Sequence, residues 1–358
     1  EYLDFLAGIA VVGLGHANPE IADAIAEQAR TLVHVSNLYG TVPGTDVAIT
    51  LDRLLGGGGQ IFFTNSGAEA IECAIKLARK WGGDGRYGVV SAYGSFHGRT
   101  LGALHATGQP AKWEGFQPLP EGFRHVAWND LAALEAAIDP SVAAVLLEPI
   151  QGEGGVHPAT AEYFEGVRRL CDERGLLMIV DEIQTGLGRT GEWFGFQHFG
   201  VEPDVVTMAK ALGNGMPIGA CWAKRDVAAV FQPGDHGTTY GGQPLAASAA
   251  RATLEILERI NAPQLAERAG AAFRHLLETV EGVIQVRGLG LLLAAELAVG
   301  IDAKAVASDL LQRGLIVNAV SPTSLRFAPP LIVSESEIAQ AVDLLSAVLA
   351  DHLFKAES

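Results

Sequence analysis

Short apolar runs alternate with helical patterns through the middle of this 358-residue chain, and this alternation limits the fold more than any other feature. The runs are Gln60–Phe63, Tyr87–Ala92, Val142–Leu147, Leu176–Val180, Val205–Met208 and Ile218–Ala223. Several of them are almost continuously apolar, which is typical of strands covered on both faces. The pattern predicts an α/β fold with a mostly parallel sheet flanked by crossover helices.

Three segments between or after these runs show helical spacing of apolar residues. They are Ala68–Lys80, Glu162–Arg174 and Leu245–Arg259. After about Asn261 the pattern changes to a long helix, a strand pair, a second helix, a short strand and a closing helix. The strand pair lies around Val286–Leu297, the short strand lies near Ile316–Asn318, and the last helix begins at Glu335. This change predicts a second, smaller α+β domain.

The opening segment YLDFLAGIAVV is interpreted as a strand that completes the smaller domain. We therefore expect residues 1–30 to be the N-terminal part of the small domain, 31–250 the large domain and 251–358 the C-terminal small domain. Because Glu1 is not an initiator methionine, a leading segment is also expected to be missing.

Composition excludes several classes of function. The net charge of −16 argues against nucleic acid and against anionic membrane surfaces as partners. Glu296 interrupts the longest apolar stretch, around Leu289–Ile301, so no membrane span is expected. Cys73, Cys171 and Cys221 are isolated and lack metal-ligand spacing, which predicts no metal site and a reducing, cytoplasmic setting.

Two charged residues follow apolar runs directly. Asp181 comes after Leu176–Val180, and Lys210 follows the run at Val205–Met208 and precedes a glycine-rich segment. Ligands bind at the carboxyl ends of strands in open α/β sheets. Alone, Asp181 would fit a helix cap or an ion pair, and Lys210 an exposed strand end. Together they fit a pyridine cofactor, because a carboxylate keeps the ring nitrogen protonated and a lysine in apolar surroundings becomes a nucleophile.

Two further segments suit the same cofactor. Thr64–Ala70 reads as a strand end, a Ser-Gly turn and a helix start, whose free backbone N–H groups would bind phosphate, although an ordinary helix cap looks the same. In the second segment, Phe96 could stack on a flat ring and Arg99 could hold a carboxylate through two parallel hydrogen bonds. Taken singly, those two residues would be assigned to core packing and surface charge.

Several phrases in the chain resemble one family. They are NSGAEA, FHGRT, EPIQGEGG, DEIQTGLGRTG, AKALGNGMPIGA and TTYGG, in this order. They resemble the class III (ω-amino acid) aminotransferases, and the resemblance runs from about Tyr2 to the C-terminal helix. It implies the fold-type-I architecture, pyridoxal 5'-phosphate as cofactor, and a homodimer with active sites at the interface.

The resemblance also implies roles around the cofactor. Lys210 would hold it as a Schiff base, and Asp181 would pair with the pyridine nitrogen. Phe96 would stack on the ring, and Gln184 would lie near its phenolic oxygen. The remaining implied cofactor-binding residues are Ser66, Gly67, Ala68, Glu182 and Ile183, together with Thr239, which would reach the phosphate of the neighbouring subunit. Ala68 stands where many relatives have threonine, so a hydroxyl is missing there while the backbone contacts need not be.

For the substrates, the resemblance implies a second set of residues. Arg99 matches the arginine that holds the α-carboxylate of ornithine-type donors. Arg326 matches the arginine that binds the α-carboxylate of 2-oxoglutarate and glutamate. Glu153 matches the glutamate that pairs with that arginine when the arginine is not needed for substrate binding. A purely structural ion pair is the alternative for Glu153. Thr238 would lie beside the substrate.

The segment GLIVNAVSPTSLRFAPPLIV, with HGTTYGG, is most similar to the acetylornithine-specific branch of the class. This implies transfer of the distal amino group of N2-acetyl-L-ornithine to 2-oxoglutarate, a step of arginine biosynthesis. Ornithine, succinylornithine, 4-aminobutyrate and a carrier-bound lysine precursor stay open as donors. A catalytically silent relative acting as a binding protein is the alternative from another class, and it would lack the lysine or its acidic partner.

Overall fold

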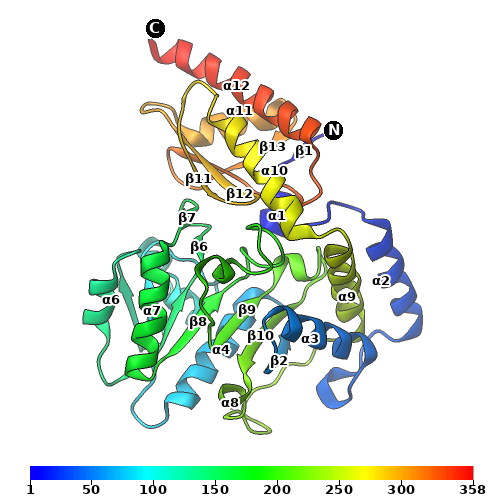
Figure 1. Cartoon of the computed structure of the whole chain (residues 1–358), viewed down its shortest axis with the longest axis vertical. Coiled ribbons are helices and arrows are strands. Elements are labelled where there is room, and N and C mark those ends of the chain that lie inside the picture. Colours follow the sequence, from blue (N-terminus) through cyan, green and yellow to red (C-terminus); the bar gives the residue numbers. More distant parts are fainter. Residues whose placement is uncertain (358) are drawn as a thin grey trace.

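The computed structural model describes residues 1–357, and its larger part is built on one seven-stranded sheet (Figure 1). The strand order is β2-β10-β9-β8-β5-β3-β4. The strands are β2 (Gly59–Thr64), β3 (Gly88–Ala92), β4 (Phe123–Val126), β5 (Val142–Leu147), β8 (Leu177–Asp181), β9 (Val205–Met208) and β10 (Gly219–Lys224). Only β10 runs antiparallel to its neighbours in this sheet, so the predicted, mostly parallel sheet is confirmed.

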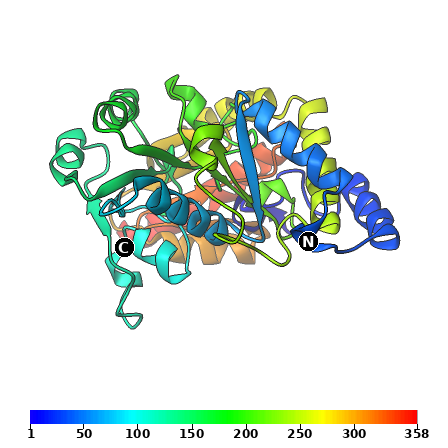
Figure 2. The same cartoon turned by 90° about the horizontal axis from the view of Figure 1, so that it is seen from below.

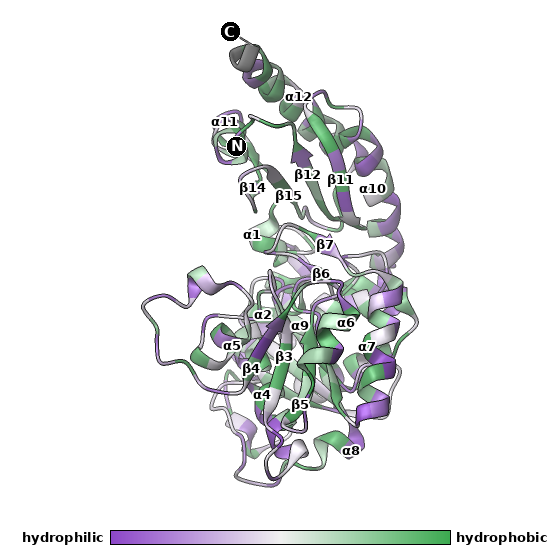
Figure 3. Cartoon of the chain, turned by 90° about the vertical axis from the view of Figure 1, so that its left-hand side faces the viewer, coloured by the Kyte–Doolittle hydropathy of each residue, from purple (hydrophilic) through white to green (hydrophobic). Residues whose placement is uncertain are grey.

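Helices cover both faces of this sheet (Figure 2). They include α3 (Val42–Leu54), α4 (Gly67–Gly82), α5 (Leu101–Ala106), α6 (Leu131–Ala137), α7 (Ala161–Arg174), α8 (Arg225–Ala228) and α9 (Pro244–Arg259). Alternate residues of one strand enter different cores: Leu146 belongs to the apolar cluster that contains α4 residues, whereas Val145 belongs to the cluster that contains α7 residues. The inner strands are apolar for this reason, and β3 is green in Figure 3 while the outer helix α7 carries many purple positions.

The edge strand β4 was not predicted. Its sequence is FRHV, and it is purple in Figure 3 because Arg124 and His125 interrupt the apolar pattern. An edge strand has only one neighbour, β3, and does not need the continuous apolar run of the inner strands.

The smaller part has a four-stranded antiparallel sheet in the order β11-β12-β15-β14. These strands are β11 (Val283–Leu289), β12 (Leu292–Leu297), β15 (Ser324–Phe327) and β14 (Asn318–Ala319). Three helices pack around the core of this part: α10 (Ala262–Leu277), α11 (Ala303–Gln312) and α12 (Glu335–Glu357). The N-terminal strand β1 (Leu3–Asp4) pairs with β13 (Leu315–Ile316) of the same part.

The structure differs from the expected boundaries at two places. Helix α2 (Pro19–Thr31) packs against α9 of the larger part, not against the small sheet. Helix α9 also continues past residue 250, because Leu254 and Leu257 are buried in the larger core. The change from one part to the other therefore falls near Asn261.

The opening segment is a strand only at Leu3–Asp4, which corrects the prediction of a longer strand. From Ala7 to Ala10 every residue has a positive φ, and the backbone forms a short left-handed turn, α1. The apolar sequence suggested a strand because it is buried, and burial alone does not specify backbone conformation. None of the helices within residues 1–357 combines the length and apolarity needed to cross a bilayer.

Candidate active site

A cavity of about 400 Å³ opens beside the carboxyl ends of β8 and β9. This volume is in the range of cofactor and substrate pockets. Predicted residues that line it are Ser66, Gly67, Ala68, Phe96, Arg99, Glu153, Asp181, Ile183, Gln184 and Lys210. The fold therefore brings together residues that lie as much as 144 positions apart, from Ser66 to Lys210.

Lys210 follows β9 and begins a short 3₁₀ turn, with a positive φ of 44°. Burial lowers the pKa of its ammonium, Glu153 opposes this shift, and Arg326 adds to it. With its amide oxygen turned toward the two cations, Gln184 lies 3.0 Å from Lys210 Nζ and 3.3 Å from Arg326 Nη1. Lys210 therefore has the lowered basicity of a nucleophilic lysine.

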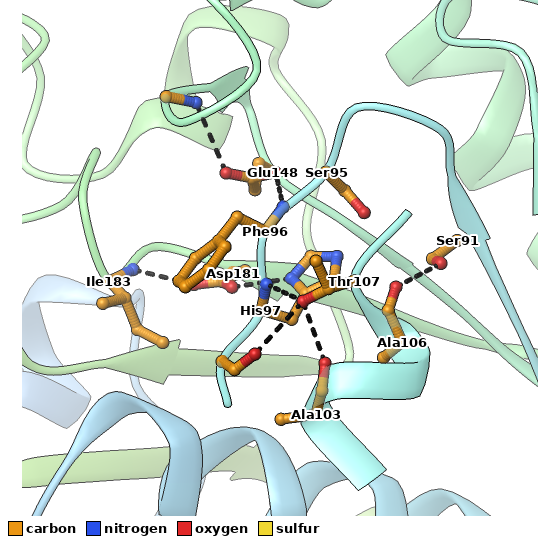
Figure 4. A network of polar contacts seen from close by, with 12 residues as sticks. Ser91, Ser95, Phe96, His97, Ala103, Ala106, Thr107, Glu148, Asp181 and Ile183 are labelled. Atoms are coloured by element: carbon orange, nitrogen blue, oxygen red, sulfur yellow. Dashed lines mark hydrogen bonds and ion pairs between the residues drawn. The ribbon is translucent and has the colours of Figure 1, made fainter. Parts of the chain in front are cut away.

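Asp181, the last residue of β8, is held from two sides (Figure 4). Its Oδ2 lies 2.8 Å from Nδ1 of His97, and its Oδ1 accepts a hydrogen bond from the Ile183 N–H at 3.0 Å. The backbone N–H of His97 donates to Thr107 Oγ1 at 2.8 Å, and this bond holds the backbone of the residue that carries the imidazole. Asp181 is 4% exposed and lines the cavity, and its two hydrogen-bond partners hold the carboxylate in one orientation there.

Sequence reasoning missed His97, although this residue lies in the FHGRT phrase. Its side chain is fully buried, and its Nε2 has no hydrogen-bond partner within residues 1–357. A polar residue between Phe96 and Arg99 was the available signal. Its partner, however, lies 84 positions away, so the contact could not be found from spacing.

Glu148, which follows β5, is a second carboxylate that sequence reasoning missed. Its Oε2 accepts from the Phe96 N–H at 3.1 Å, and its Oε1 accepts from the Gly152 N–H at 3.4 Å. Burial raises the pKa of Glu148 well above its usual range, and the nearby Asp181 raises it further. The carboxyl group thus ties the segment that carries Phe96 to the turn that precedes Glu153.

The turn before α4 forms the other end of the cavity. Ser66 caps the helix, and its Oγ accepts from the Glu69 N–H at 3.2 Å. A Cβ on Gly67 would lie 2.8 Å from Ile183 Cδ1, so a larger residue here would have to displace the Ile183 side chain. The first N–H groups of a helix have no partner inside the helix and attract anions. This turn, the buried lysine and the held carboxylate fit the phosphate, the aldehyde carbon and the ring nitrogen of pyridoxal 5'-phosphate.

The substrate side carries a buried ion pair. Arg326 on β15 is 0% exposed and contacts Glu153 through Nη1, while its Nε donates to Asn318 Oδ1 at 3.1 Å. Burial raises the pKa of Glu153, but Arg326 outweighs this effect and the net pKa lies below the usual value. Arg99 is exposed at the cavity edge, with its guanidinium carbon 5.4 Å from the centroid of the Phe96 ring.

Four predicted residues are not among those that line the cavity: Glu182, Thr238, Thr239 and Arg326, the last of which contacts the lining residue Glu153. The carboxylate of Glu182 is turned into the core, where it accepts from the Gly195 N–H at 2.9 Å and the Phe196 N–H at 2.8 Å. A cofactor contact through this side chain is therefore corrected to a structural role. Thr238 lies close by, since its Oγ1 accepts from Asn65 Nδ2 at 3.3 Å, and Thr239 is exposed on the same loop.

Comparisons with known proteins agree with this geometry. The family model described as "Aminotransferase class-III" matches residues 1–349. An acetylornithine aminotransferase of Caldanaerobacter subterraneus subsp. tengcongensis is 49% identical, over 99% of this chain and 91% of that protein. One of Methanocaldococcus jannaschii is 46% identical, over 98% and 89%. The solved ornithine aminotransferase of Toxoplasma gondii superposes with a TM-score of 0.94 at 34% identity, over 100% of this chain and 88% of that one.

Enzymes of this class depend on pyridoxal 5'-phosphate, and the cavity holds a lysine, a carboxylate and a helix N-terminus suited to that group. The full-length family match and the residues that line the cavity point to the same conclusion. The chain belongs to the class III aminotransferases.

Proposed function

We propose that the protein transfers the distal amino group of N2-acetyl-L-ornithine to 2-oxoglutarate, giving N-acetyl-L-glutamate 5-semialdehyde and L-glutamate. The observation that supports amino transfer between two such substrates is the buried Glu153–Arg326 pair beside Lys210. The choice of donor rests on the acetylornithine aminotransferases that are 49% and 46% identical to this chain.

The residues of this chain divide the work. When bound, pyridoxal 5'-phosphate supplies an electron sink. Lys210, whose pKa is lowered, accepts a proton at Nζ from the substrate carbon and returns it during the reaction. Asp181 is oriented by His97 and by the Ile183 N–H, so it would hold the protonated ring nitrogen without rearranging. The buried Phe96 segment excludes water from one face of the site.

Glu153 and Arg326 account for the two substrates. While the two are paired, the arginine is neutralised and the pocket accepts the distal amine of the donor. When 2-oxoglutarate enters, its carboxylate replaces Glu153 at Arg326. Glu153→Gln removes the competing charge, so we expect α-amino substrates to be favoured, with KM for glutamate falling relative to KM for the acetylated donor. Asp139→Asn, at an exposed ion pair with Arg124, is the control. An unchanged donor preference in Glu153→Gln contradicts this mechanism.

A panel of donors tests the substrate assignment. The holoenzyme is supplied with 2-oxoglutarate and with acetylornithine, ornithine, succinylornithine, 4-aminobutyrate or a carrier-bound lysine precursor, and glutamate formation is measured. We expect the highest kcat/KM for acetylornithine, and a better donor among the others overturns the assignment. Lys210→Ala should abolish both activity and the visible absorption of the lysine-bound cofactor. A wild-type protein without this absorption supports the silent relative instead.

We also propose a cytoplasmic homodimer. Leu38, Tyr39, Val42 and Tyr240 are all more than 60% exposed in the single chain. The His34 and Tyr240 ring centroids lie 5.2 Å apart, so the segment that begins at His34 lies beside the loop that carries Thr239. An apolar surface of this kind is typical of a subunit interface. The three cysteines are free thiols, which supports a reducing compartment.

A further inference from the structure

A second cavity, of about 160 Å³, lies between helix α4, the edge strand β2, its neighbour β10, and helix α8. It shares no lining residue with the cavity around Lys210. Cys73 of α4 and Cys221 of β10 both line it, together with Phe62 and Phe231. Two of the three cysteines of the chain therefore meet at one cavity, although they are 148 positions apart in the sequence.

His236 packs against two aromatic side chains that line this cavity. Its ring centroid is 4.8 Å from that of Phe62 and 5.8 Å from that of Phe231. Lys76, one turn after Cys73 on α4, places its Nζ 2.9 Å from Nδ1 of His236. An ammonium group can only donate, so Nδ1 accepts and the imidazole carries its hydrogen on Nε2. Nε2 of His236 is therefore a hydrogen-bond donor in this arrangement.

The two thiols have unequal surroundings. The interaction with Cys221 lowers the pKa of Cys73, burial opposes this, and His236 and the Lys76 charge lower it further. The same interaction raises the pKa of Cys221, as does burial. The nearest carboxylate on the loop, Asp235, is paired with Lys80. Of the two thiols, Cys73 therefore has the lower pKa and is the better nucleophile.

Cys171 provides a comparison within the same chain. It is 0% exposed on α7, away from this cavity, and burial raises its pKa to about 12. Arg168 lowers this pKa, but burial outweighs it, and Asp204 and Asp172 raise the pKa further. Cys171 is therefore expected to be inert while the protein is folded.

We propose that Cys73 and Cys221 form a peroxide-responsive thiol pair. The Cys73 thiolate attacks one oxygen of a peroxide, the O–O bond breaks, and Cys73 becomes a sulfenic acid. The alkoxide or hydroxide that leaves takes up the proton that the Cys73 thiol had released, which gives an alcohol or water. The Cys221 sulfur then attacks the Cys73 sulfur, the S–O bond breaks, and water leaves with the proton of the Cys221 thiol. In total, two thiols are oxidised to one disulfide and one peroxide is reduced. The cavity beside both side chains admits the small oxidant and leaves room for the sulfur atoms to approach.

The experiment uses the purified holoenzyme and hydrogen peroxide. After treatment, free thiols are blocked and peptides are mapped by mass spectrometry. We expect a dithiothreitol-sensitive Cys73–Cys221 cross-link with loss of two hydrogen atoms, and an unmodified Cys171. In Cys221→Ser, Cys73 should instead be trapped by dimedone as the sulfenic acid. Cys171→Ser, the matched control, should form the cross-link as the wild type does.

A kinetic measurement separates this site from ordinary buried thiols. Iodoacetamide should alkylate Cys73 of the folded protein at neutral pH. His236→Phe should slow this reaction by roughly threefold or more, because the ring is kept while the N–H donor is lost. Two results overturn the proposal: Cys171 reacting as fast as Cys73 in the folded protein, or no Cys73–Cys221 cross-link in wild type at peroxide concentrations that oxidise a free thiol. Neither result depends on which amino donor the enzyme uses.

Discussion

At the scale of single residues, Asp181 depends on a neighbour outside the predicted set. His97 holds Oδ2 at 2.8 Å in a fully buried contact, and a hydrogen bond to a charged group contributes about 1.5–3 kcal/mol. We expect His97→Ala to weaken cofactor binding and to lower kcat by roughly 10-fold to 100-fold. His97→Asn, whose amide can replace the donor, should recover part of the loss. Cofactor titration by absorbance and steady-state kinetics test this, and equal defects in both variants contradict it.

Glu182 makes stability depend on pH. Burial raises its pKa from 4.5 to about 7, so between these values the folded protein keeps a proton that the unfolded chain releases. Stability therefore falls as pH rises through this window. Between pH 6 and pH 8 the contribution of Glu182 should fall by about 1.4 kcal/mol.

Glu182→Gln cannot titrate, and comparison with it isolates this effect. Urea unfolding at pH 6 and pH 8 should show that the variant is less destabilised, relative to wild type, at the higher pH. The same difference at both pH values would mean that Glu182 is already ionised at pH 6.

At the scale of elements, the left-handed turn α1 carries backbone strain. Ile9 has φ 68° and ψ 55° and is 42% exposed, and a β-branched residue is costly in this region. Asparagine tolerates the conformation, so Ile9→Asn should stabilise the protein by about 0.5–1 kcal/mol. Ile49→Asn is the control, since Ile49 is 62% exposed in the right-handed helix α3 and asparagine is the poorer helix former. In thermal unfolding, Ile9→Asn should raise Tm and Ile49→Asn should lower it. If both variants lower Tm, the turn is not strained at Ile9.

At the scale of the whole molecule, the exposed apolar segment near Leu38 should matter only in an assembly. Leu38 is 79% exposed, so Leu38→Glu costs little in a single chain but places a charge in the proposed interface. We expect sedimentation velocity to show a shift from dimer to monomer, with loss of activity. Val299→Glu changes a residue that is 97% exposed on the small part and should remain dimeric and active. A Leu38→Glu protein that stays dimeric places the interface elsewhere.

The inner strands could be predicted because a strand buried on both faces must be apolar along its length. Val142–Leu147 and Val205–Met208 begin and end as the sequence predicted. The edge strand β4 and the strand β15 were missed because polar residues interrupt both: Arg124 and His125 in β4, and Ser324 and Arg326 in β15. Lys210 and Asp181 could be named because each directly follows such an apolar run.

Contacts between distant segments were decided by the tertiary structure alone. His97 meets Asp181 across 84 positions, Glu148 joins the Phe96 segment to the turn before Glu153, and Cys73 meets Cys221 at the second cavity. Spacing along a chain reports which residues share one helix or strand. It does not report which strand lies beside which, and that order, β9-β8-β5-β3, determines which side chains meet. The sequence by itself therefore determined the lysine, its acidic partner and the class of fold, while packing decided what holds that acid in place.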